Sequence, residues 1–282
     1  MPIDVIAAVL LAALVHAGWN AIAKSTGATD PMISTSAIAI GGGIVALPLL
    51  LVSGLPATTS YPYVFASGVI HVLYFVLVGL AYRAAEYSAV YPITRGSAPL
   101  ATSLLAAALL GEAMAPLAWC GVVLLSSGIL GLGSDSLLRG ALSARAISIA
   151  GLNVAVIVGY TLIDGEGARA SLNPAGYVIA MMAITGALLL PVVMVWLGPG
   201  SARALLARWR IGLVGGAMVS LSYGIALWAM TKAPIGMVAA LRETSVLFAT
   251  IIAACVLREK FGLQRWISTG LILAGLAAIR MG

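Results

Sequence analysis

Charged residues are scarce in this sequence, and their scarcity excludes a water-soluble protein. Asp, Glu, Lys and Arg make up 9% of its 282 residues, against about 25% in an ordinary soluble domain. Hydrophobic residues make up 62%, and the mean hydropathy is +1.10. A soluble chain of this length cannot bury that much apolar surface, so we predict an integral membrane protein.

Cysteines and the common catalytic motifs are also nearly absent. Cys120 and Cys255 both lie in apolar stretches, without the spacing of a disulfide framework or a metal site, and we expect small buried side chains there. The sequence contains no HExxH, nucleophile elbow or Walker A motif, which disfavours a peptidase, a lipase and an ATP-driven pump. We therefore expect no enzyme activity, no cofactor and no metal.

One short motif matches part of an enzyme signature. Residues 164–169, DGEGAR, resemble the opening Asp-Gly-x-x-Ala-Arg of membrane CDP-alcohol phosphotransferases. Those enzymes need further aspartates to hold two metal ions, and the residues that follow, ASLNPAGYVIAMMAITG, contain no acid. We interpret the match as chance and expect Asp164 and Glu166 at the mouth of a cavity.

Long apolar stretches are what the sequence has in abundance. A membrane-spanning helix needs about 20 mostly apolar residues, and Gly, Pro and charged residues divide the chain into ten such stretches. None alternates as the strands of a membrane barrel do, so we predict an all-α membrane protein with ten transmembrane helices. Their predicted limits are 4–23, 31–52, 62–82, 87–110, 116–133, 146–164, 174–197, 211–231, 235–257 and 262–280.

Basic residues indicate how these helices are oriented. The first stretch lacks the basic start of a cleavable signal peptide, so we interpret it as a transmembrane helix. Connections after odd-numbered stretches carry ten Lys or Arg, whereas those after even-numbered stretches, together with the C-terminal end, carry three. The positive-inside rule then predicts an inner-membrane protein with both termini on the outer side. The basic residues form no patch with stacking aromatic rings, which argues against nucleic-acid binding.

The second half of the chain repeats the first. With a shift of 147 residues, Arg95 falls on Arg242, Glu112 on Glu259, Trp119 on Trp266 and Gly128 on Gly275, and with a shift of 141 Trp19 falls on Tyr160. An Arg, a Glu and a Trp in one register indicate internal duplication. Each half contains an odd number of stretches, so the second half enters the membrane from the opposite side. We therefore predict two inverted five-helix repeats, residues 1–135 and 146–282, an arrangement common in secondary transporters.

These segments resemble a known family. Each half has a turn with a Glu, LLGEAMAPLAWCG and VLREKFGLQRWIS, followed by a Gly-containing helix. With HAGWNAIAK, VYPITRGSAPL and ALRETSVLF, they are similar to the EamA branch of the drug/metabolite transporter superfamily. The resemblance covers essentially the whole chain and implies a ten-helix fold and alternating-access transport. Cargoes of the superfamily include amino acids, nucleotide sugars, phosphate esters and cations, so the resemblance does not name the cargo.

Arg95 and Arg242 are unusual because each lies about two turns inside an apolar helix. An arginine at the centre of a membrane helix costs about 2.5–3.5 kcal/mol on insertion scales. Equivalent positions of inverted repeats are related by an axis in the membrane plane, so we expect both guanidinium groups to face a central cavity and to hold an anionic group. The resemblance adds that relatives carrying phosphate esters use basic residues on the fourth and ninth helices. In the structural alternative, Arg242 pairs with a carboxylate and Arg95 extends to the membrane interface.

Glu243 follows Arg242 but lies about 100° away around the helix. Its counterpart in the first half is Gly96, so the two halves differ at this point. We consider two roles for Glu243: a counter-ion for an arginine, or a proton carrier that couples transport.

Other polar side chains in the apolar stretches need partners in lipid, so their faces should point inward. The residues that we expect to line the cargo pocket are Trp19, Asn20, His71, Tyr74, Tyr91 and Tyr160. The alternative is ordinary hydrogen bonding between helices or a place in an interfacial aromatic belt. Glu112 and Glu259 end the fourth and ninth stretches, and we interpret them as caps of the helix that follows each.

The sequence therefore predicts a secondary transporter for a small polar metabolite with an anionic group, such as an amino acid or a phosphate or phosphonate compound. An exporter of aromatic or cationic compounds and a channel are the alternatives. Cation transport requires a membrane carboxylate as the dominant charge, and a channel requires rings of carbonyls or charges from several subunits. The expected partners are the metabolite and membrane lipid, with protons as a candidate coupling ion and a monomer or homodimer as the assembly.

Overall fold

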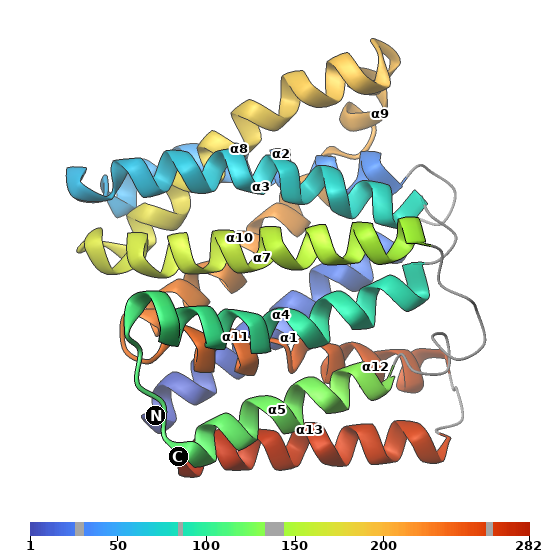
Figure 1. Cartoon of the computed structure of the whole chain (residues 1–282). Coiled ribbons are helices and arrows are strands. Elements are labelled where there is room, and N and C mark those ends of the chain that lie inside the picture. Colours follow the sequence, from blue (N-terminus) through green and yellow to red (C-terminus); the bar gives the residue numbers. More distant parts are fainter. Residues whose placement is uncertain (26–30, 84–86, 133–143, 258–261) are drawn as a thin grey trace.

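The computed structural model describes residues 1–25, 31–83, 87–132, 144–257 and 262–282 (Figure 1). The side chains of residues 23–25, 31, 79, 81–83, 87–92, 144–146 and 252–257 are not described. Tyr91, Cys255 and Glu259 therefore lie outside the described side chains, and their predicted roles stay predictions.

The described part of the chain is helical and contains no strand. The helices are α1 (Ile3–Ser25), α2 (Pro31–Ser53), the short 3-10 helix η1 (Thr58–Ser60), α3 (Tyr61–Arg83), α4 (Tyr87–Leu110), α5 (Pro116–Leu132), α7 (Ala144–Ala170), α8 (Pro174–Leu197), α9 (Gly200–Leu206), α10 (Trp209–Met230), α11 (Ile235–Arg242), α12 (Ser245–Leu257) and α13 (Leu263–Met281). Among the described residues, seven helices are long and apolar enough to cross a membrane. The prediction of an all-α, multi-pass membrane protein is confirmed.

The predicted stretch 235–257 differs from the structure, because it is not one continuous helix. It consists of α11 and α12, separated by a turn at Glu243 and Thr244. At this turn the backbone N–H groups of Glu243 and Thr244 bond three residues back, at 3.1 Å each, and the Thr244 hydroxyl donates to the Leu241 carbonyl at 2.7 Å. A side-chain hydroxyl that competes for a helix carbonyl favours such a break. The charged pair Arg242–Glu243 thus lies at the junction of two half-helices.

The long helices run side by side, and both termini lie at the same end of the bundle (Figure 1). Helix α5 packs along α13, α2 contacts both α8 and α10, α1 packs on α10, and α3 packs on α7. Large apolar side chains such as Leu51, Leu109 and Val195 are exposed on the outer surface, where lipid would cover them. Cys120 is also exposed, so the prediction that it is buried is wrong.

Glycines allow the central helices to touch through their backbones. A β-carbon on Gly43 of α2 would lie 3.0 Å from the Cα of Gly186 in α8, and one on Gly41 would overlap the backbone of Gly212 in α10. Small residues permit this approach in lipid, where van der Waals packing drives helix association. The run of three glycines at 41–43 therefore allows α2 to pack closely against both α8 and α10.

Candidate functional site

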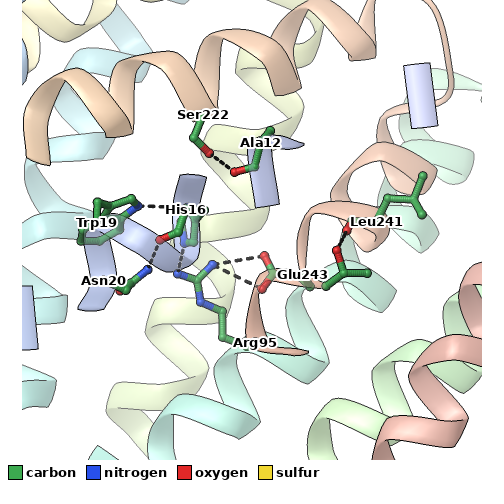
Figure 2. Close-up of polar contacts among 9 residues, drawn as sticks. Ala12, His16, Trp19, Asn20, Arg95, Ser222, Leu241 and Glu243 are labelled. Carbon is green, nitrogen blue, oxygen red and sulfur yellow. Dashed lines mark hydrogen bonds and ion pairs between the residues drawn. The ribbon is translucent and has the colours of Figure 1, made fainter. Parts of the chain in front are cut away.

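The break between α11 and α12 directs Arg242 and Glu243 to different neighbours. The Arg95 Nη1 of α4 donates to both carboxylate oxygens of Glu243, at 3.1 and 3.3 Å (Figure 2). Each side chain of this ion pair is 5% exposed. The predicted counter-ion role of Glu243 is thus seen with Arg95, and not with the arginine beside it in the sequence.

His16 of α1 receives two donors that it cannot satisfy together. The Arg95 Nη2 lies 3.0 Å from His16 Nε2, and the Trp19 indole N–H lies 3.2 Å from His16 Nδ1. Guanidinium and indole groups only donate, whereas a neutral imidazole has a single bare nitrogen. His16 therefore accepts from Arg95 or from Trp19, and the two contacts compete (Figure 2). Asn20 is buried and donates to the His16 carbonyl at 3.0 Å.

A small cavity of about 40 Å³ lies between α1, α3, α7, α8, α10 and α11. It is lined by His16, Trp19, His71, Tyr74, Phe75, Tyr160, Met182, Val219, Tyr223 and Arg242. A cavity holds a water molecule once it offers roughly 10–15 Å³ to the probe, so this one has room for a few waters. Larger hollows of about 690 and 610 Å³ lie beside α2, α8 and α10 and are lined mainly by apolar side chains, as expected of surfaces that face lipid.

Arg242 is the charged side chain of the cavity lining. It is 5% exposed, and its Nε is buried with no hydrogen-bond partner among the described residues. Its Cζ lies 5.2 Å from the centre of the Tyr223 ring, within the range of a cation–π contact. Arg95, by contrast, is engaged by Glu243 and His16. The two arginines of the repeat therefore have different surroundings, and the structure brings one of them to the cavity.

Aromatic rings form one wall of the cavity, and Tyr223 in this wall contacts Arg242. The His71 ring lies 4.4 Å from that of Tyr160 and 5.5 Å from that of Tyr223, and Tyr74 lies 5.4 Å from Tyr160. Trp19, His71, Tyr74 and Tyr160 of the predicted set thus meet at one place, from three helices. Of the remaining predicted residues, Asn20 is buried next to this wall without lining the cavity.

Asp164 was not among the residues predicted to form the cargo site. It is fully buried in α7, and it accepts a hydrogen bond from Tyr177 at 2.8 Å and another from Tyr223. The sequence did hold a signal, because Asp164 is an acid at the end of a long apolar run. Its placement with Glu166 at a cavity mouth is wrong, since a carboxylate in this network has no solvent contact. Within the described residues no cluster of His, Cys, Asp and Glu could hold a metal ion.

A second charged cluster joins the ends of four helices. Arg169 of α7 pairs with Glu112, after α4, and with Glu166, at 2.7 Å for the latter. It also donates to the carbonyls of Met230 at 3.0 Å and Ala233 at 3.3 Å. The two carboxylate oxygens of Glu112 accept from the Ile235 N–H, at 3.0 and 2.8 Å. Glu112 therefore caps α11, and the prediction that it caps the helix that follows it is wrong.

We expect Glu112→Ala to lower the free energy of unfolding by about 1–2 kcal/mol, because it removes the cap of α11. Glu166→Ala is the matched control, since Glu166 pairs with the same arginine but is 35% exposed. Exposed pairs contribute about 0–1 kcal/mol. Detergent-solubilised protein unfolded with increasing SDS gives both values, and equal losses in the two variants would contradict the capping role.

The comparisons with known proteins agree with this architecture. A solved structure titled "Crystal structure of protein" is similar in fold, with a TM-score of 0.77 and 18% sequence identity over 100% of this chain and 98% of that chain. No curated protein matches the sequence. The model of the EamA-like transporter family matches residues 145–281. Together with the seven long apolar helices, this match supports a multi-pass membrane transporter. The resemblance seen in the sequence is thus confirmed over this half, since residues 145–281 match the EamA-like transporter family.

Proposed function

We propose that the protein is a secondary transporter of the inner membrane, and that it moves a small metabolite with an anionic group by alternating access. Arg242 carries this proposal. It is a buried guanidinium that faces an aromatic cavity and lies at the break of a membrane helix, and its Nε has no hydrogen-bond partner in the described part of the chain. Half-helices that meet at mid-membrane form the cargo sites of many transporters.

The charges around the cavity favour an anion. Glu243 is paired with Arg95, so Arg242 has no carboxylate of its own within hydrogen-bond distance among the described residues. Helix α12 begins three residues after Arg242, and the N-terminus of a helix attracts negative charge. A buried unpaired cation is unfavourable, and a carboxylate, phosphate or phosphonate of the cargo would provide the missing partner.

The rings around Arg242 favour a cargo that also has a planar or apolar part. Four rings, His71, Tyr74, Tyr160 and Tyr223, form one wall of the cavity, and offset or edge contacts with such rings are favourable. An amino acid with a ring offers an anionic group to Arg242 and a planar group to these rings, once the cavity widens. A purely cationic cargo lacks a partner, because none of the described residues that line the cavity is a carboxylate.

Reciprocal contacts support the two inverted repeats, residues 1–135 and 146–282. A β-carbon on Gly128 would lie 2.8 Å from the Ser268 carbonyl oxygen and 3.0 Å from the Ile272 nitrogen. One on Gly275 would lie 2.7 Å from each of the matching atoms of Gly121 and Leu125. Each of these residues has its counterpart 147 positions away, so α5 and α13 exchange the same contacts, as surfaces related by a twofold axis do.

Other helices follow the same rule. Gly43 of α2 meets Gly186 of α8, which lies 143 residues later, and both helices carry an internal proline at the same shift, Pro48 and Pro191. Helix α1 packs on α10 while its counterpart α7 packs on α3, the counterpart of α10. We infer ten crossings, the ninth formed by α11 and α12 together, with the shared end of the termini on the outer side.

Helix α11 connects Arg242 at the cavity to the charged cluster of Glu112 and Arg169. Glu112 holds the N-terminus of α11, and Arg242 is the last residue of that eight-residue helix. The cluster closes the bundle at the end where the termini lie, and the cavity is too small for a metabolite. Separation of Glu112 from α11 would free α11 to shift and the cavity to widen toward that end.

Uptake into proteoliposomes tests the proposal. The panel contains labelled phenylalanine, glutamate, glycerol 3-phosphate, aminoethylphosphonate and choline. We expect transport of at least one anionic or zwitterionic compound, and a fall of about 10- to 100-fold in Arg242→Gln, which is the factor for losing a charged hydrogen bond of about 1.5–3 kcal/mol. Arg242→Lys keeps the charge without the planar fork and should fall in between.

Arg280→Gln is the control, because Arg280 is exposed near the end of α13. It should transport at the wild-type rate. Transport of choline alone, or normal rates in Arg242→Gln, would show that the anion assignment is wrong.

A further inference from the structure

A row of buried polar side chains leads from the cavity to the carboxylate of Asp164. His71 lines the cavity, and its Nδ1 lies 3.0 Å from the Ser67 carbonyl and 3.1 Å from the Ser67 hydroxyl. A carbonyl only accepts, so Nδ1 carries the hydrogen in the neutral ring and Nε2 is bare. The Ser67 hydroxyl is in turn one of the polar groups near the Asp164 carboxylate.

We propose that His71, Ser67 and Asp164 form a proton relay behind the cargo cavity, and that Asp164 carries the coupling proton. This inference rests on the proposed transport function. A proton from the cavity binds His71 Nε2, the Nδ1 proton passes to the Ser67 oxygen, and the original hydroxyl proton of Ser67 passes to Asp164. One proton enters and one carboxylate becomes neutral. The transfer needs no other reactant, and the reverse sequence releases the proton.

The residues around Asp164 connect its charge to the cargo site. Its neighbours come from three helices: His71 from α3, Tyr177 from α8 and Tyr223 from α10. Arg242 of α11 lies beyond Tyr223. Arg95 of α4 is directed instead to Glu243 and His16. Tyr223 connects the two sites, because its hydroxyl donates to Asp164 while its ring lies against Arg242.

Protonation of Asp164 has two consequences at the cavity. The carboxyl group gains a donor, so one of the hydroxyl groups that donate to it must turn away. The negative charge bonded to the Tyr223 hydroxyl is also removed, so an anionic cargo beside Arg242, which lies against the ring of Tyr223, meets less repulsion. Proton and anion therefore bind with positive coupling, and by thermodynamic linkage each raises the affinity for the other. The cargo moves as an anion together with a proton.

Infrared difference spectroscopy tests the proton site without any cargo. Spectra of the reconstituted protein between about pH 5 and pH 9, in H₂O and in D₂O, report the carboxyl group that takes up a proton. We expect a buried carboxyl band in the wild type and in Glu166→Gln, a carboxylate two residues away on α7, and no band in Asp164→Asn. Persistence of the band in Asp164→Asn, or its loss in Glu243→Gln instead, would overturn the proposal.

A second variant decides the case if Asp164→Asn does not fold. Tyr223→Phe removes one donor to Asp164, so the carboxyl band should shift in frequency. An unshifted band would assign it to another carboxylate and reject the relay.

Transport with the compounds of the panel gives an independent readout. Asp164→Asn mimics the protonated state, so we expect it to exchange labelled for unlabelled cargo but to lose the acceleration by a pH gradient. Ser67→Ala should keep the infrared band and slow gradient-driven uptake by on the order of 10-fold or more. An Asp164→Asn response to the gradient equal to that of the wild type would contradict coupling at this residue. If no compound is moved, the infrared result still decides the proton site, and the transport proposal fails separately.

Discussion

Replacement of Arg95 by Met is expected to lower the stability of the protein by about 3–5 kcal/mol, the effect of leaving one buried charge without its partner. The residue left behind is Glu243, which is 5% exposed and receives both of its ion-pair hydrogen bonds from Arg95. The double variant Arg95→Met/Glu243→Met removes both charges, and it should recover most of the loss, because well-packed apolar side chains often replace a buried ion pair without destabilisation. Unfolding in SDS mixed micelles measures all three free energies.

Arg242→Met is the matched control for this cycle. Arg242 has nearly the same exposure, 5% against 4% for Arg95, but no ion pair with any residue that the structure describes. Its removal loses a cation–π contact with Tyr223 and relieves an unpaired buried charge, so its stability should stay within about 1 kcal/mol of the wild type. The two arginines of the repeat would then have different roles: Arg95 forms a structural ion pair, and Arg242 is a binding residue. Similar losses in both variants would mean that Arg242 has a strong partner too.

The positions of the helices could be predicted from the sequence, because membrane helices satisfy every backbone group internally and only long apolar runs can form them. The break at Glu243 and Thr244 could not. No glycine or proline stands there, and the turn arises from the Thr244 hydroxyl and the tightened backbone bonds around it. Because the turn could not be predicted, the arginine that pairs with Glu243 could not be predicted either.

The partners of the buried charges could be predicted only in part from the sequence. Gly96 stands where a second glutamate would be, which indicated that the two halves differ beside the arginines. In the structure the single glutamate, Glu243, pairs with Arg95. Asp164 was set aside because it begins a six-residue motif that resembles an enzyme signature. The equivalence of Pro48 with Pro191 lay in the sequence as well, but at a shift of 143 rather than 147. A shift that varies along the chain reflects connections of unequal length between equivalent helices.

Alanine at Gly128 or at Gly275 is expected to destabilise the protein by about 1–3 kcal/mol, the usual effect of overpacking a tight contact. The added carbon would lie 2.8 Å from the Ser268 carbonyl oxygen in the first case and 2.7 Å from that of Gly121 in the second. Both obstacles are backbone atoms, which cannot rotate away as a flexible side chain would. Gly270→Ala, on the same helix as Gly275, is the control, since nothing lies within 4 Å of its added carbon.

The two losses should also be equal, and that equality tests the inverted repeat. Gly128 and Gly275 are 147 residues apart and meet matching atoms of the opposite half, so a twofold relation requires the same energetic effect at both. Gly270→Ala should instead leave stability unchanged or raise it by up to about 1 kcal/mol, the helix-propensity gain of Ala over Gly. If one of the tight glycines accepts alanine while the other does not, α5 and α13 do not present equivalent surfaces, and the repeat does not extend to this interface.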